Sequence, residues 1–254
     1  MKNKYTLECC VDSLVSAHAA LRGGADRLEL CANLIIGGTT PTMALYQKMR
    51  EQTDTDIRVL IRPRFGDFLY SEEEACIMCR EIEAFRKAGA DGIVIGSLRA
   101  DGSLHIEQMK RFMEQAGDMH VTLHRAFDMC RDSLEALRQA GELGIHTILT
   151  SGRATSCTKG ISLFKELLPL SGNQITILAG GGVDADAVKT LLSQTALTDF
   201  HMSGKKRISS GMQYRNPSVS MGLPGMDEYT LWQTDEESIR SVRTLLDEAA
   251  AENL

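Results

Sequence analysis

The chain has 254 residues, of which 5 % are aromatic and 22 are glycine, and its formal net charge is −6. That length suffices for one large core, and a (β/α)8 barrel takes about 250 residues as a single domain. Because both signs of charge are dispersed along an acidic chain, we expect no nucleic acid partner. The chain has no run of about 18 apolar residues and starts without a signal-peptide pattern, so we expect no membrane span. Seven cysteines without a disulfide-scaffold spacing predict a cytoplasmic location.

Eight short apolar segments follow one another along the chain and are predicted to be strands. In order they are residues 5–11, 24–30, 57–61, 89–95, 120–123, 144–150, 175–179 and 196–201. Four of them share an entry pattern of a small residue and two linker residues, and these begin at residues 24, 89, 144 and 196. Each interval is about twice the roughly 25–30 residues of one βα unit. Helical periodicity fills the gaps, most clearly in residues 71–88, 106–115 and 133–143.

Strands that alternate with helices predict a parallel sheet, and eight such units close into a (β/α)8, or TIM-type, barrel. An open doubly wound sheet is the alternative, but it would place a glycine fingerprint after the first strand, where Cys10-Val11-Asp12-Ser13 is not one. We therefore predict one domain over residues 1–254. Residues 202–234, rich in Ser, Gly and Met, predict an insertion before the last helix that lies across a barrel face or mediates self-association.

Side chains of a barrel strand point alternately inward and outward, and this alternation gathers polar residues at the C-terminal strand ends. The residues predicted to face the interior there are Glu8, Cys10, Glu29, Cys31, Arg62, Arg64, His124 and His201. Inward charges are costly unless they are paired. Two interpretations remain open: an ion-pair network that plugs the barrel, or a polar pocket where such barrels carry out their chemistry.

In the pocket interpretation, His124 is the best general acid or base, since an unperturbed histidine has a pKa of about 6.5. Glu8, Glu29 and His201 are further catalytic candidates. Arg62 and Arg125 are predicted to hold a carboxylate or phosphate. Asp128 either caps the following helix or pairs with Arg125, and we favour the pairing.

Glycines and small residues suggest an anion site at the same end. Phosphate sites of barrels commonly use the loops after strands 7 and 8, although simple turn geometry also explains bare glycines. The full set of candidate anion-binding residues is Arg62, Arg64, Arg125, Ser151, Gly180, Gly181, Gly182 and Ser203. The loop 33–41 is either a lid over this end or a long βα turn.

Cys10 and Cys31 are predicted to be neighbours on adjacent strands. Two thiolates suit a soft ion such as Cu(I), but free cysteines are also common as small buried apolar residues. On chemistry alone we favour the second interpretation. Cys76 and Cys79 lie in the apolar stripe of a helix without a second pair, which predicts a structural role.

The sequence closely resembles the CutC family over nearly its whole length. The matching motifs are ECCVDS (8–13), GGADRLELC (23–31), GGTTPT (37–42), IRPR (61–64), GDFLY (66–70), HRAFDM (124–129), LTSG (149–152) and GGG (180–182). The resemblance implies a barrel, a cytoplasmic location, self-association and a role in copper homeostasis. It also implies Cu(I) binding by Cys10 and Cys31. Cys9 stands where the family usually has an apolar residue, and we expect it to face the helices.

Three functions therefore compete. The resemblance favours a copper-handling protein whose partner is the copper ion. The residue chemistry favours an enzyme for a small anionic metabolite, phosphorylated or carboxylate, with His and Glu acid–base chemistry and Arg anchors. A purely structural homo-oligomer would leave the polar groups paired with one another.

Overall fold

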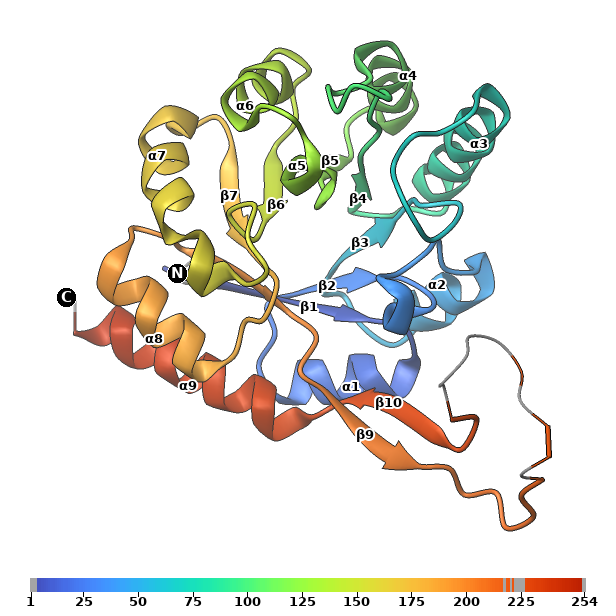
Figure 1. Cartoon of the computed structure of the whole chain (residues 1–254). Coiled ribbons are helices and arrows are strands. Elements are labelled where there is room, and N and C mark those ends of the chain that lie inside the picture. Colours follow the sequence, from blue (N-terminus) through green and yellow to red (C-terminus); the bar gives the residue numbers. More distant parts are fainter. Residues whose placement is uncertain (1–3, 217, 220, 222–226, 253–254) are drawn as a thin grey trace.

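The computed structural model describes residues 4–216, 218–219, 221 and 227–252. Eight parallel strands close into a barrel in the order β1 to β8, which confirms the predicted (β/α)8 fold (Figure 1). Their bounds are β1 Thr6–Val11, β2 Arg27–Leu30, β3 Asp56–Leu60, β4 Gly92–Ile95, β5 His120–Leu123, β6 Thr147–Thr150, β7 Thr176–Ala179 and β8 Asp199–Met202. The barrel closes where β1 pairs with β8, with Glu8 opposite His201.

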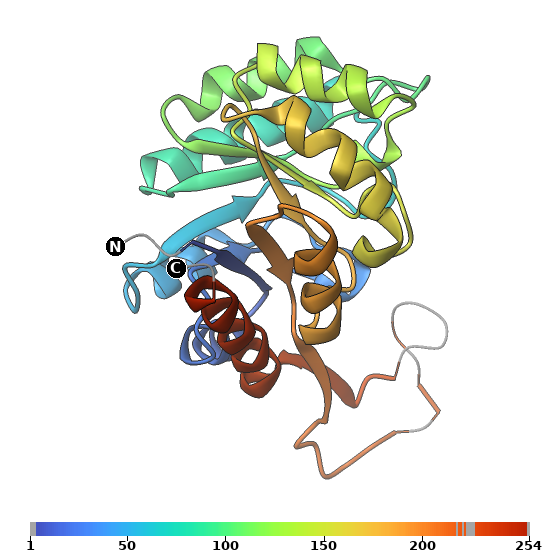
Figure 2. The same cartoon turned by 90° about the vertical axis from the view of Figure 1, so that its left-hand side faces the viewer.

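Helices surround the barrel (Figures 1 and 2). They are α1 Leu14–Arg22, α2 Met43–Arg50, α3 Glu72–Lys87, α4 Ile106–Ala116, α5 Ala126–Met129, α6 Ser133–Glu142, α7 Ile161–Ser171, α8 Ala185–Gln194 and α9 Glu236–Ala251, with the 3-10 turns η1 Leu34–Ile36 and η2 Cys157–Gly160. The Ser71 hydroxyl accepts from the Glu74 N–H while the Glu74 carboxylate accepts from the Ser71 N–H, so a capping box begins α3. Among the described residues, no helix is long and apolar enough to cross a membrane.

The repeated strand entry has a conformational cause. Gly24, Gly89 and Gly144 have φ angles of +94°, +83° and +77°, which is the left-handed region that favours glycine. Each glycine follows the end of a helix and reverses the chain toward the next strand. The pattern read from the sequence is therefore a series of helix-terminating glycines.

The strands carry two apolar surfaces. Outward residues such as Leu7, Cys9 and Leu28 are fully buried in the main core between barrel and helices. Inside the barrel, Cys31 packs with Leu60 and Val94 in a separate small cluster. Because Cys9 belongs to the outer core, the structure places its thiol toward the helices, as its position in the strand predicts.

The segment between the last barrel strand and the last helix forms an antiparallel hairpin of β9 (Lys205–Ser209) and β10 (Thr230–Thr234). Trp232 lies opposite Arg207, and the cations of Lys205 and Arg207 lie 5.4 and 5.1 Å from its ring. The hairpin lies beside α1 and extends outward from the barrel (Figures 1 and 2). Residues 217, 220 and 222–226 of the predicted insertion lie outside the described residues.

Candidate functional site

A small cavity of about 120 Å³ lies at the C-terminal ends of the barrel strands. Its volume corresponds to roughly four water molecules in the liquid. The lining residues are Cys10, Glu29, Leu34, Gly37, Leu60, Arg62, Phe68, His124, Arg125, Leu149 and His201. Six of them are candidates from the sequence, namely Cys10, Glu29, Arg62, His124, Arg125 and His201, so the structure brings this part of the predicted site together.

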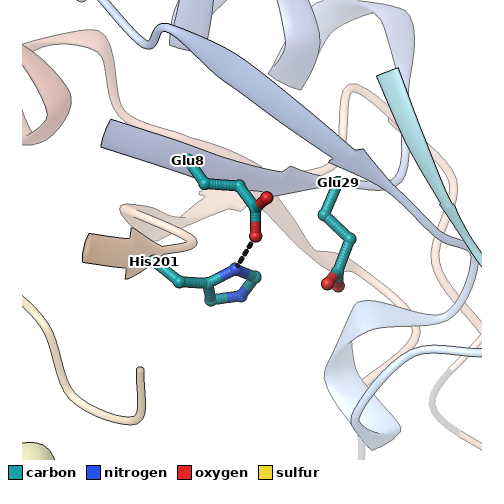
Figure 3. A group of neighbouring side chains, drawn as sticks. All are labelled: Glu8, Glu29 and His201. Carbon is teal, nitrogen blue, oxygen red and sulfur yellow. Dashed lines mark hydrogen bonds and ion pairs between the residues drawn. The ribbon is translucent and has the colours of Figure 1, made fainter. Parts of the chain in front are cut away.

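Glu8 is fully buried and pairs with two cations, Arg27 and His201, of which Figure 3 draws the pair with His201. Its Oε2 accepts from Arg27 Nε at 2.5 Å, and its Oε1 lies 2.6 Å from His201 Nδ1. Burial alone would raise the pKa of Glu8, but Arg27 and His201 outweigh it and hold that pKa far below its usual value. Burial opposes the charge of His201 as well, yet Cys10, Glu29 and Glu8 raise its pKa well above the usual value. Both oxygens of Glu8 are therefore committed to structural pairs.

Glu29 differs from Glu8 although both carboxyl groups are buried (Figure 3). It lies opposite Cys10 in the register of β1 and β2, and its Oε2 has no hydrogen-bond partner. The pKa of Glu29 is raised to about 7. Burial is the largest cause of the rise, the charge of His201 opposes it, and the charge of Glu8 adds to it. Glu29 therefore exchanges a proton near neutral pH, as a general acid or base requires.

Glu8, Glu29 and His201 form a group that could hold a metal, since one donor atom of each lies within 4.8 Å of the others. The nearby charges oppose a divalent ion there. Glu8 is already paired with Arg27, and the raised pKa of His201 makes it a second cation. A hard divalent ion would have to displace both pairs, so the structure favours the ion-pair arrangement.

His124 is buried in a neutral form. Its Nδ1 accepts from the Ala126 N–H at 3.1 Å, which places the ring proton on Nε2. Burial, assisted by the charge of Arg62, lowers the pKa of His124 to about 3. The buried Nε2 has no partner. His124 therefore presents an uncharged N–H donor at neutral pH, rather than a group that titrates near pH 6.5.

Arg62 fastens the loop 33–41 over the cavity. Its Nη1 donates to the carbonyls of Gly37 and Gly38 at 3.1 and 3.0 Å, and its Nη2 donates to Gly66 at 2.7 Å. Its guanidinium carbon lies 5.1 Å from the centre of the Phe68 ring. Leu34 and Gly37 of the loop line the cavity, so this loop covers the barrel end. Only Nε of Arg62 is buried without a partner.

Arg125 belongs to a second network at the rim. Its Nε donates to Asp128 Oδ2 at 2.8 Å and its Nη2 to Ser151 Oγ at 2.8 Å. Asp128 thus pairs with Arg125, whereas Asp132 caps the following helix α6. A Cβ on Gly181 would lie 3.0 Å from the Ser151 Cβ, so the glycine tract runs directly over this network.

Other anion candidates lie outside the cavity lining. Arg64 pairs with Glu74 at 2.6 Å and Asp67 at 3.0 Å, and 37 % of its side chain is exposed. The Ser203 carbonyl accepts from the Thr234 hydroxyl. Gly180, Gly181 and Gly182 also do not line the cavity, although a Cβ on Gly180 would lie 3.6 Å from the His201 ring.

Arg27 and Arg58 are inward residues that the sequence reasoning missed. Both line a cavity of about 580 Å³ at the opposite, N-terminal end of the barrel. The alternation that places Glu29 inward also places Arg27 inward two residues earlier, so this signal was present in the sequence. Arg27 explains why Glu8 is charged, because it is an ion-pair partner of Glu8 that was absent from the predicted site.

Cys10 and Cys31 are free, buried thiols, of which Cys10 lies in β1 and Cys31 directly follows the neighbouring strand β2. Cys10 Sγ lies 3.6 Å from the Met202 carbonyl oxygen, and Cys31 Sγ lies 3.5 Å from that of Val11. Burial raises the pKa of Cys31 well above its usual value, and the charge of Cys10 is the next largest cause. The softness of both sulfurs fits Cu(I).

Access differs between the two thiols. Cys10 lines the cavity, whereas Cys31 is fully buried against Leu60, Val94 and Leu34. A Cβ on Gly38 would lie 3.6 Å from the Cys31 sulfur, so the loop 33–41 lies directly over it. An ion that contacts both sulfurs must therefore pass this loop.

The fold and the site together define a (β/α)8 barrel whose C-terminal end holds a buried cluster of thiol, carboxyl and imidazole groups beneath a loop. Comparison with the sequences and structures of known proteins identifies the family. The chain belongs to the CutC family, whose model matches residues 5–206.

Its relatives match most of the chain. A CutC family protein of Bacteroides fragilis is 46 % identical over 223 residues, which cover 87 % of this chain and 88 % of the relative. The human copper homeostasis protein cutC homolog is 40 % identical over 244 residues, covering 96 % and 89 %. A crystal structure of the proposed copper homeostasis protein CutC from Streptococcus agalactiae gives a TM-score of 0.75 at 27 % identity, covering 78 % of this chain and 98 % of that one. The family assignment therefore rests on sequence and fold together.

Proposed function

We propose that this protein takes part in copper homeostasis by binding one Cu(I) ion between Cys10 and Cys31. The observation that carries the proposal is the pair of buried thiols, one in β1 and one directly after β2, of which the first lines a cavity and the second lies beneath the loop beside it. Thiolates are the ligands that Cu(I) prefers. The names of the human and streptococcal relatives support the same cargo.

The charges around the thiols support a monovalent ion. Two thiolates and one Cu(I) together carry a net negative charge, which suits a position beside the protonated His201. His201 interacts with Cys10 through a side-chain hydrogen bond, and the charge of Cys10 raises its pKa. Because the pKa of Cys31 is raised by burial, this thiol is protonated before the ion binds. Copper binding therefore releases protons.

We also propose that the protein acts in the cytoplasm and as a homo-oligomer. Seven cysteines without a disulfide between them are typical of a reducing compartment. Exposed apolar side chains on the segment between β9 and β10 support self-association, among them Met212, Tyr214 and Met221. Light scattering coupled to size exclusion tests the oligomer, and replacing these three residues by Ser should lower the mass to that of one chain.

The copper proposal is tested by titrating reduced, metal-free protein with Cu(I) against a competing chelator. We expect one tight equivalent in the wild type and its loss in the Cys10→Ala, Cys31→Ala double variant. The matched control is the Cys76→Ala, Cys79→Ala variant, which removes two thiols from α3 and should bind like the wild type. Unchanged binding in the first variant, or equal losses in both, would refute the site.

A further inference from the structure

Three buried polar atoms without partners belong to residues that line the cavity at the barrel end. They are Glu29 Oε2, Arg62 Nε and His124 Nε2. Their residues are only 6 %, 7 % and 5 % exposed, and they come from the ends of three different strands. Buried polar groups in folded proteins are nearly always hydrogen-bonded. Three unpaired atoms around one cavity therefore indicate that something with complementary atoms occupies it.

The other unpaired atoms of the described residues do not share this cavity. They are Arg27 Nη2, Arg50 Nε, Arg58 Nη1, Tyr70 Oη, Thr122 Oγ1 and Arg243 Nε. Two of them, Arg27 Nη2 and Arg58 Nη1, belong to residues that line the cavity of about 580 Å³ at the N-terminal end of the barrel. The cavity at the C-terminal end differs in combining an unpaired carboxyl oxygen with two unpaired donors. Its remaining walls are largely apolar, formed in part by Leu34, Leu60 and Phe68.

We propose that this cavity binds a small carboxylate of two to four carbons. One ligand oxygen accepts from the Nε2–H of His124, and the other accepts from the Nε–H of Arg62. The short carbon chain lies against the apolar wall, and Glu29 contacts a polar group at its far end. The binding site lies next to the thiol pair but does not use Cys31.

Charge and size select a carboxylate over a phosphate. Of the two arginines that line the cavity, Arg62 has no carboxylate partner among the described residues, whereas Arg125 is paired with Asp128. One cation and one neutral N–H match a planar anion with two oxygens and a single charge. A phosphate would need donors for more oxygens, and the glycines at 180–182 do not line the cavity. A volume of about 120 Å³ admits only a few heavy atoms.

Calorimetry on the reduced, metal-free full chain tests the proposal with acetate and pyruvate as probes. Acetamide has the shape of acetate without its charge, and inorganic phosphate tests the alternative anion. We expect both carboxylates to bind, and acetamide and phosphate to bind at least tenfold more weakly. Failure of both carboxylates to bind folded wild-type protein, or equal binding of acetate and acetamide, would overturn the proposal.

Two variants locate the site. His124→Asn keeps an acceptor for the Ala126 N–H but removes the Nε2–H, and its matched control is His120→Asn at the other end of the barrel. Arg62→Lys removes the Nε–H, and its control is Arg64→Lys outside the cavity. We expect each site variant to weaken acetate binding at least tenfold and each control to leave it within twofold. Wild-type affinity in both site variants, with their folds intact by circular dichroism, would contradict the assignment.

The Cys31→Ala variant separates this proposal from the copper proposal. It should lose Cu(I) and retain acetate binding, because Cys31 does not line the cavity and both ligand donors belong to His124 and Arg62. Loss of acetate binding in this variant, while its fold remains intact, would count against a separate carboxylate site. Absence of Cu(I) binding in the wild type would leave the acetate result unaffected.

Discussion

Replacing Glu8 by Gln removes a buried negative charge that pairs with two buried cations, Arg27 and His201. The carboxylate accepts from Arg27 at 2.5 Å and pairs with His201 at 2.6 Å, and none of its side chain is exposed. A glutamine amide has one acceptor oxygen, so its NH₂ group must face one of the two donors. Breaking a buried ion pair by removing one partner costs about 3–5 kcal/mol.

The expected loss is measurable as a fall in thermal stability. One kcal/mol shifts Tm by roughly 2–4 °C in a domain of 150–250 residues, so Glu8→Gln should lower Tm by roughly 6–20 °C. Thermal unfolding followed by circular dichroism, and urea unfolding at 25 °C, measure the change. The matched control is Glu142→Gln, because Glu142 and its partner Arg138 are 62 % and 61 % exposed. An exposed pair contributes about 0–1 kcal/mol.

The pH dependence of the stability difference tests whether the loss comes from the ion pairs of Glu8. The pKa of Glu8 is depressed in the folded protein, so its contribution is present above the unfolded value and is lost as pH falls through the folded value. His201 has a raised pKa, so its contribution is full below the unfolded value and is lost as pH rises through the folded value. The wild type should therefore be more stable than Glu8→Gln by the largest margin at pH values above the unfolded pKa of Glu8 and below the unfolded pKa of His201. A difference below about 1 kcal/mol at pH 6 would refute the ion-pair reasoning.

Three further predictions concern neighbouring residues. The pKa of Glu29 is raised from 4.5 to about 7, so its protonated form, which stabilises the folded protein, is lost as pH rises through 7. The free energy of unfolding should therefore fall as pH rises, and Glu29→Gln should abolish this fall when unfolding in urea is measured across the pH range. A Cβ on Gly96 would lie 2.6 Å from the His124 ring, so Gly96→Ala should displace the ring and weaken acetate binding in calorimetry at least tenfold. Cys9→Ala should lower the free energy of unfolding by about 1–2 kcal/mol without changing the Cu(I) stoichiometry, because its thiol is buried in the outer core.

Strand periodicity explains how much of the fold was predictable. The entry glycines Gly24, Gly89 and Gly144 mark real turns into strands, so spacing alone gave eight units. Alternation then placed Cys10 and Glu29 inward, and both line the cavity. These inferences hold because a parallel barrel constrains every residue within a strand by the same period of two.

Beyond the strand ends, that constraint disappears. Arg64 follows Arg62 by two residues, and alternation placed both in the pocket, yet Arg64 turns outward to Glu74. Strand β3 ends at Leu60, so the period no longer applies there. The protonation states were equally hidden, because the low pKa of His124 arises from burial and from Arg62 rather than from its sequence neighbours.

The two proposals place different chemistry on opposite sides of one small space, and the charges show why they are compatible. On the thiol side, the imidazolium of His201 lies beside Cys10 and balances the excess negative charge of a dithiolate–Cu(I) unit. On the other side, Arg62 balances a carboxylate, while His124 contributes a donor without charge. A copper ion on the thiols and a carboxylate at Arg62 would therefore each lie beside a counter-charge of its own.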